Sequence, residues 1–180
     1  IRKEVARFMS VHLQTITAPV ITTLLFYIVF ATAFRGSGRE AYGFDFMVFL
    51  APGLIMMSMA QNAFANTSSS ILGSKMQGNI VDILMPPLNS NEIIFSYVSA
   101  AIIRSILVGF ITWLFIYPFS ELYLFSLSIL FIYSTLGSIL LALLGLIAGI
   151  WAEKFDNMSG ITNFIITPLT FLSGTFYTID

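Results

Sequence analysis

Residues 122–152 have the sequence LYLFSLSILFIYSTLGSILLALLGLIAGIWA, which contains no charged side chain. Uncharged stretches also cover residues 8–34, 46–74 and 157–179, and a fifth, 93–120, is interrupted only by Arg104. A spanning helix needs about 20 mostly apolar residues, and backbone in lipid must satisfy its own hydrogen bonds. Each stretch therefore predicts one helix that crosses a membrane.

The composition of the 180 residues agrees with this interpretation. The chain is 57% hydrophobic and 9% charged, whereas soluble proteins carry roughly 25% charged residues. This excludes an ordinary soluble domain and a disordered chain, and the net charge of −1 gives no reason to expect a nucleic-acid partner. We expect an all-α polytopic membrane protein with one transmembrane domain over residues 1–180. The expected spans are 16–34, 46–66, 94–117, 123–151 and 161–176.

The distribution of lysine and arginine predicts the orientation. With a cytoplasmic N-terminus, the five basic residues Arg2, Lys3, Arg7, Lys75 and Lys154 lie inside, whereas Arg35 and Arg39 lie outside. The chain also opens on Ile1 and stops at Asp180, directly after an apolar segment. We therefore expect that residues are missing at one or both ends.

Residues 1–13 form a separate element. Ile1, Val5, Phe8 and Met9 fall on one helical face, with charged residues elsewhere. This pattern is typical of a helix that lies in the membrane interface, with its basic side toward anionic lipid. A simple cytoplasmic extension of the first spanning helix is the alternative.

The connection over residues 67–92 is the longest expected on the cytoplasmic side. Its centre has the spacing of a short amphipathic helix, which must end at Met85 because Pro86 and Pro87 disfavour helical backbone. Ser90 or Asn91 can cap the next helix. The segment is either a handle for a soluble partner or a tight turn on the lipid headgroups.

The sequence offers no catalytic constellation. It has no cysteine, one histidine and no phosphate-binding G-x-x-x-x-G-K-[ST] loop, so we expect a non-catalytic chain that binds no nucleotide or metal itself. The one formal charge inside an expected span is Arg104. Its guanidinium can pair with an acidic group of a substrate, bind carbonyls at a helix end, or extend toward the cytoplasm; we favour a structural role.

Two sets of residues concern helix contacts. Gly145 and Gly149 form a GxxxG pattern, which lets helix backbones approach closely, within this chain or between two copies. Polar side chains within the spans avoid lipid, so they face either a wet pathway or other helices. The candidates for a substrate path are Gln61, Asn62, Asn66, Asn163 and Thr167.

Three strings carry a resemblance to a known family. They are LAPGLIMMSM at residues 50–59, a hydrophilic helix ending in LMPP and followed by NEII over residues 75–94, and TPLTFLSGTFY at residues 167–177. In this order and spacing the chain resembles the permease subunits of ABC-2 type ATP-binding-cassette exporters. The likeness is greatest to the bacterial group that includes nodulation-factor, drug and glycan export permeases.

The resemblance implies a six-helix permease of the bacterial inner membrane that works as a homodimer above two ATPase subunits, which bind ATP and magnesium. It implies an interfacial helix at 1–13, a coupling helix in the region 70–90, and the start of an outer re-entrant hairpin at 171–180. The sixth helix of the family is missing here. The implied contacts with the ATPase are Lys75, Gln77, Gly78, Asn79 and Asp82.

These expectations define a function and an alternative. The function is export of a lipid, glycan or drug-like substrate, driven by ATP that a separate subunit hydrolyses. The alternative is a channel or scaffold that works without nucleotide.

Overall fold

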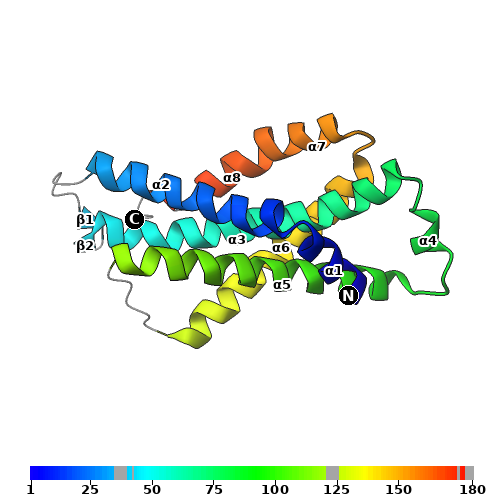
Figure 1. Ribbon diagram of the computed structural model, residues 1–180, viewed down its shortest axis with the longest axis horizontal. Helices are drawn as coiled ribbons and strands as arrows, with labels where there is room; N and C mark the ends of the chain where they lie inside the picture. The colour runs from blue at the N-terminus through cyan, green and yellow to red at the C-terminus, as the bar shows by residue number, and fades with distance from the viewer. Residues whose placement is uncertain (35–39, 42, 121–125, 174, 177–180) are drawn as a thin grey trace.

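The computed structural model describes residues 1–34, 40–41, 43–120, 126–173 and 175–176, which form an elongated helical bundle (Figure 1). η1 and η3 are π-helical turns, and η2 is a 3-10 turn. The elements in chain order are α1 (Arg2–Ser10), η1 (Leu13–Thr17), α2 (Ala18–Phe34), β1 (Glu40–Ala41), β2 (Phe44–Asp45), α3 (Phe46–Met76), α4 (Val81–Leu84), α5 (Ser90–Ile116), η2 (Tyr117–Phe119), α6 (Leu127–Trp151), α7 (Phe155–Ile161), η3 (Thr162–Ile166) and α8 (Thr167–Phe171).

Four of the described helical segments are long and apolar enough to cross a membrane. They are Leu13–Phe34, Phe46–Met76, Ser90–Phe119 and Leu127–Trp151. The expected all-α polytopic architecture is thereby confirmed. Residues 123–125 of the expected fourth span lie outside the described residues.

The expected fifth span differs from the prediction. Instead of 161–176, the helical run extends from Phe155 to Phe171 through α7, η3 and α8. At about 1.5 Å per residue this run covers roughly 25 Å, less than a hydrocarbon core of about 30 Å. It ends where the Ser173 hydroxyl donates to the Thr170 carbonyl, 2.7 Å away, and so satisfies a free helix-end carbonyl. Residues 174 and 177–180 of the expected outer hairpin lie outside the described residues.

Helix α3 is ten residues longer than the expected span 46–66, because its polar C-terminal half stays helical. The Thr67 hydroxyl donates to the Ala142 carbonyl of α6 at 2.8 Å, and the Ser74 hydroxyl donates to Ser70 of its own helix at 2.9 Å. Their hydrogen bonds are thus satisfied without a loop. As a result, the connection that we expected from residue 67 begins only after Met76.

Helix α3 occupies the centre of the bundle, against α6, α5 and α2. Its closest neighbour is α6, because two glycines of α6 face it. A Cβ atom on Gly145 would lie 2.5 Å from the Phe64 carbonyl oxygen, and one on Gly149 would lie 3.0 Å from the Ser68 carbonyl oxygen. The small-residue pattern therefore serves a contact within the chain.

Local capping fixes where two long helices begin. Asp45 ends the β1–β2 hairpin, and its carboxylate accepts from the Met47 amide at 2.9 Å to cap α3. At the start of α5, the Glu92 carboxylate accepts from the Asn89 amide at 2.8 Å. The cap is thus Asn89 and not Ser90 or Asn91 as expected, since the backbone is still extended at Asn89.

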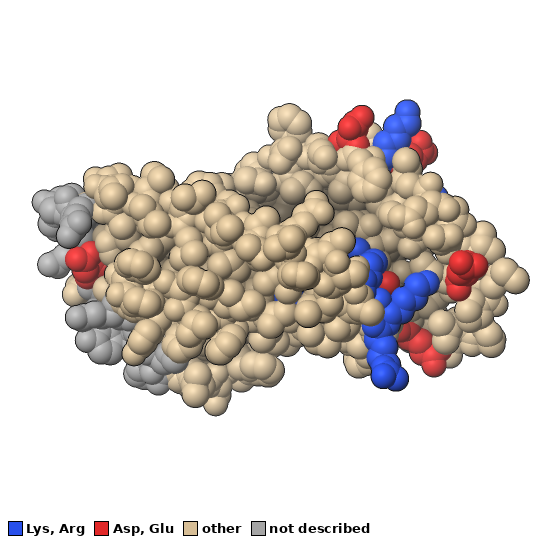
Figure 2. Space-filling model, in the orientation of Figure 1, with Lys and Arg blue, Asp and Glu red and all other residues tan. Residues whose placement is uncertain are grey.

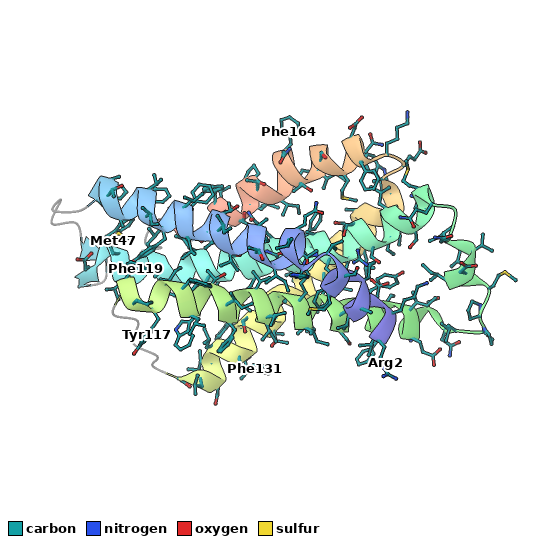
Figure 3. All side chains as sticks on the ribbon, viewed as in Figure 1. Arg2, Met47, Tyr117, Phe119, Phe131 and Phe164 are labelled. Atoms are coloured by element: carbon teal, nitrogen blue, oxygen red, sulfur yellow. The ribbon has the colours of Figure 1, made fainter. Side chains whose placement is uncertain are left out.

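The outer surface of the bundle is apolar along its length. Phe131 of α6 and Phe164 of η3 point outward (Figure 3) and are 60% and 82% exposed. Lysine and arginine gather at the end that carries α1, α4 and the start of α7 (Figure 2). A long body without charges on the face seen in Figure 2, with basic residues gathered at one end, is what a lipid-embedded bundle requires.

Candidate functional site

A cavity of about 380 Å³ lies between α2, η1, α3, α5 and η3. Cavities of this size hold small molecules in many proteins. The space-filling view shows a hollow in the surface between α2 and the α7–η3–α8 run (Figure 2). Its polar lining residues are Gln14, Thr22, Thr23, Ser58, Gln61, Asn62, Arg104, Thr162 and Thr167.

Arg104 brings a positive charge to the wall of this cavity. It lies 14 residues after the first residue of α5, which places it about 21 Å along the helix, near mid-span. Only 6% of the residue is exposed, and its Nη2 donates to the Asn62 side-chain oxygen at 2.9 Å. The side chain therefore crosses to α3 and does not extend toward the cytoplasm.

Asn62 is held in one orientation by its own helix. Its Nδ2 donates to the Ser58 carbonyl at 2.9 Å, so its oxygen is the atom that faces Arg104. The Arg104 Nε and the Ser58 hydroxyl are buried without a hydrogen-bond partner among the described residues. Two residues that line the cavity thus carry buried hydrogen-bonding atoms that the described part of the protein leaves unused.

No carboxylate of the described residues forms an ion pair with Arg104. The ion pair that the described chain contains joins Arg7 and Glu4, 3.2 Å apart. A guanidinium stays protonated in proteins. The cavity wall therefore carries a positive charge, and among the described residues its hydrogen-bond partner is one amide oxygen, that of Asn62.

The opposite wall joins α3 to the C-terminal helical run. The Gln61 amide nitrogen donates to the Thr170 hydroxyl at 2.9 Å. The Thr167 hydroxyl donates to the Thr162 carbonyl at 2.9 Å, five residues back, as the wider π-helical turn of η3 allows. These bonds fix the α8 side of the cavity to the same stretch of α3 that contacts Arg104.

The five predicted path residues separate into two groups. Gln61, Asn62 and Thr167 line the cavity. Asn66 is fully buried elsewhere, where it accepts from Arg7, and Asn163 is exposed on η3. The structure brings the first three together and leaves the other two outside this cavity.

Arg7 and Glu4 attach α1 to α3. The Glu4 carboxylate accepts from the Ser70 hydroxyl at 2.6 Å and from Arg7 Nε at 3.2 Å. Arg7 Nη2 donates to both the carbonyl and the side-chain oxygen of Asn66, at 3.0 and 3.2 Å. We call these four residues the α1 latch. Glu4 and Arg7 thus face protein, not the polar side of an interfacial helix as we expected.

The expected coupling region is a turn followed by the single-turn helix α4. Gly78 has φ +74°, a backbone conformation that favours glycine. Gln77, Asn79 and Asp82 are exposed, as are the apolar side chains of Leu84 and Met85, at 67% and 77%. The segment projects from the charged end of the bundle (Figure 1). It presents mixed polar and apolar side chains to the outside.

Lys75 differs from the other four predicted coupling residues, because it lies in the last turn of α3. Its Nζ donates to the carbonyls of Ile150 and Ala152, at 2.8 and 2.6 Å, with Gly149 at 3.4 Å. The ammonium therefore satisfies the free carbonyls at the C-terminal end of α6, where a positive charge is favourable.

Sequence reasoning missed two parts of the site. Ser58 precedes Gln61 and Asn62 by three and four residues, which puts all three on one face of a helix, and this spacing was a usable signal. Thr22 and Thr23 donate to carbonyls of their own helix, at 2.9 Å each. Such self-satisfied threonines carry no sequence signal that distinguishes a cavity wall from a lipid-facing surface.

Comparison with known proteins gives one family and several relatives. The whole chain, residues 1–180, matches the family described as ABC-2 type transporter. It is similar to the "Inner membrane transport permease YadH" of Escherichia coli strain K12 and of Shigella flexneri, 38% identical in each case. The match covers 98% of this chain and 69% of the relative. No solved structure matches the chain.

Proposed function

Since the chain belongs to the ABC-2 type transporter family, we propose that it is the permease subunit of an ATP-binding-cassette exporter in the bacterial inner membrane. It moves a lipid, glycan or drug-like substrate out of the cytoplasm, and a separate subunit binds ATP and magnesium and supplies the energy. The match over all 180 residues is the observation that carries this proposal. The name of the YadH relatives, an inner membrane transport permease, supports the location.

The segment Gln77–Leu88 is the contact with the ATPase subunit. It lies at the charged end, outside the apolar body, and its side chains are free to dock. Gly78, Asn79, Gln77 and Asp82 supply polar contacts, and the exposed Leu84 and Met85 supply apolar area. Lys75 contributes indirectly, because it joins this end of α3 to the C-terminal end of α6.

Two copies of the chain form the transport unit, and α3 transmits the motion. The coupling segment follows α3 directly, and α3 also carries Ser58, Gln61 and Asn62 of the cavity wall. Because a helix is stiff, a push on the segment after Met76 displaces these side chains about four turns away. The cavity then opens alternately to either side of the membrane.

Co-purification tests the proposed partner. The permease is expressed with the ATPase encoded beside it, and the complex is assayed for ATP hydrolysis in liposomes. We expect Asp82→Lys to lower co-purification about tenfold, and Gly78→Val to do the same by straining the turn. Asp156→Lys, which changes an exposed acid at the same end of the molecule, is the matched control.

Two results would contradict the proposal. One is normal association and transport in both segment variants. The other is full transport or ion conductance by the permease in liposomes without any ATPase, which would favour a channel.

A further inference from the structure

We propose that the cavity at Arg104 is a binding site for an anionic group, a phosphate or a carboxylate, carried by an amphipathic molecule. This inference rests on the proposed function and deepens it, because it assigns a charge to the substrate class. Arg104 supplies the charge, Asn62 positions it, and Ser58 supplies a hydroxyl donor.

The uncompensated charge is the first argument. Buried cations in proteins are paired with carboxylates or bound ions, because removing a charge from water is unfavourable. Arg104 is 94% buried near mid-span, and one amide oxygen is its hydrogen-bond partner in the described chain. An anion that enters the adjacent cavity would provide the missing compensation.

The unused donors are the second argument. The Arg104 Nε and the Ser58 hydroxyl lack a partner in the described chain, and although both residues line the cavity, these two atoms are buried behind its wall, so that a ligand would reach them after a side-chain rotation. An arginine fork and a hydroxyl match the several oxygens of a phosphate or the two oxygens of a carboxylate. The Asn62 nitrogen donates one hydrogen to the Ser58 carbonyl, which keeps the Asn62 oxygen turned toward Arg104.

The rest of the lining favours an amphipathic ligand over a free ion. Phe26, Leu54, Met57, Phe64 and Ile166 line the cavity together with the polar residues. A free inorganic anion would contact Arg104 but would lose part of its water shell against these apolar side chains. An apolar tail attached to the anionic group would instead be buried favourably.

The acid of the α1 latch does not compete for this site. The Glu4 carboxylate already accepts from Ser70 and Arg7. Arg7 is in turn occupied by Asn66, one helical turn from Asn62. The two arginines thus differ: Arg7 is paired, whereas Arg104 faces a cavity.

Thermal unfolding of the purified full-length permease in a neutral maltoside detergent tests the site directly. Three probes are compared. Dodecyl phosphate carries both the anionic group and the apolar tail, inorganic phosphate carries the anionic group alone, and dodecanol carries the tail without a charge. We expect dodecyl phosphate to raise the Tm by about 5 °C at a hundredfold excess over its Kd. Dodecanol should leave the Tm unchanged.

Three variants separate binding from folding. Arg104→Gln should abolish the shift with dodecyl phosphate, and Arg104→Lys should reduce it by half or more because the fork is lost. Asn62→Asp places a carboxylate beside Arg104 and should raise the Tm without ligand while it abolishes the response. Arg2→Gln removes an exposed arginine far from the cavity and is the control with an unchanged response.

Each outcome decides the proposal. A shift with dodecyl phosphate alone supports an amphipathic anion. No shift with dodecyl phosphate, or an equal shift with inorganic phosphate at the same concentration, overturns the proposed ligand. An equal shift with dodecanol, or an undiminished shift in Arg104→Gln or Asn62→Asp, would overturn it. The assay needs no ATPase, so normal association of Asp82→Lys and Gly78→Val with the ATPase would contradict the proposed function and leave this result standing.

Discussion

At Gly145 the absence of a side chain allows α6 to lie close against α3. The position faces the Phe64 carbonyl oxygen, 2.5 Å from where a Cβ atom would stand. Backbone carbonyls cannot move aside as a flexible side chain can, so an added carbon must separate the helices. Gly137, on the same helix, has no atom within 4 Å of its Cβ position. The two glycines therefore differ in function: Gly145, which belongs to the GxxxG pattern, faces α3, whereas Gly137 has open space at its Cβ position.

We predict that Gly145→Ala and Gly137→Ala change stability in opposite directions. Gly145→Ala should destabilise the fold by about 1–3 kcal/mol through overpacking. Gly137→Ala should stabilise it by about 0.5–1 kcal/mol, because alanine loses less backbone freedom in a helix. Unfolding midpoints of the two purified variants measure the difference. An unchanged midpoint in Gly145→Ala would show that the two helices are not in close contact.

At the scale of elements, α1 is joined to the bundle by side chains and not by a long apolar face. Phe8 is 1% exposed, but Met9 of the same helix and Ile1, which precedes the helix, are 46% and 47% exposed. The α1 latch of Glu4, Arg7, Asn66 and Ser70 supplies the remaining attachment. The position of α1 therefore depends on a few buried polar contacts.

Glu4→Ala should release α1 from α3. The change leaves Arg7 without its ion-pair partner and the Ser70 hydroxyl without an acceptor, a loss of roughly 1–3 kcal/mol. Amide hydrogen exchange within Val5–Ser10 should rise about tenfold or more, since about 1.4 kcal/mol corresponds to a factor of ten. Lys3→Ala, an exposed residue of the same helix, is the control. Equal exchange in both variants would exclude the latch.

Lys75 makes a second connection between elements, from the end of α3 to the end of α6. Replacing it by methionine keeps the length of the side chain and removes the charge that the Ile150 and Ala152 carbonyls contact. We expect Lys75→Met to cost about 0.5–1 kcal/mol, concentrated in the last turn of α6. Hydrogen exchange of the amides at 148–152 reports it. Lys154→Met is the control and should leave the exchange rates of those amides unchanged. If Lys75→Met also exchanged at the rate of the unmodified protein, the contact would be refuted.

The elements also show what the sequence could and could not predict. Long uncharged stretches gave the four spanning helices, because membrane thickness sets their length. The predicted end of α3 was wrong by ten residues. Thr67 and Ser70 are polar, as loop residues usually are, and the sequence does not show the hydrogen-bond partners that they have inside the bundle. Those partners, Ala142 and Glu4, are 75 and 66 residues away. No local pattern identifies contacts over such distances.

The same limit applies to the candidate site. Gln61, Asn62 and Thr167 were predicted from the rule that polar residues avoid lipid, and they line the cavity. The rule cannot separate them from Asn66, which follows Asn62 by one turn but meets Arg7. For Arg104 the sequence predicts a structural role or a substrate contact, and it does not show whether a partner carboxylate is near.

At the scale of the whole molecule, the charges define two unlike ends. Arg2 and Phe119 lie at opposite ends of the bundle (Figure 3). The end with Arg2 also holds the coupling segment and Lys75, and the long body between carries no charge on the surface seen in Figure 2. Arg35 and Arg39 lie outside the described residues. Because basic residues concentrate on the cytoplasmic side of membrane proteins, this asymmetry predicts a cytoplasmic N-terminus.

Single cysteines test that orientation without background, since the chain contains no cysteine. Asn79→Cys marks the exposed turn before α4, and Phe119→Cys marks the opposite end, where the side chain is 72% exposed. In intact cells, a maleimide that cannot cross membranes should label Phe119→Cys and spare Asn79→Cys. Permeabilised cells should show labelling of both, which controls for access. The reverse pattern would place the coupling segment outside the cell, where it could not bind a cytoplasmic ATPase subunit. That result would contradict the proposal that a separate subunit supplies the energy for transport.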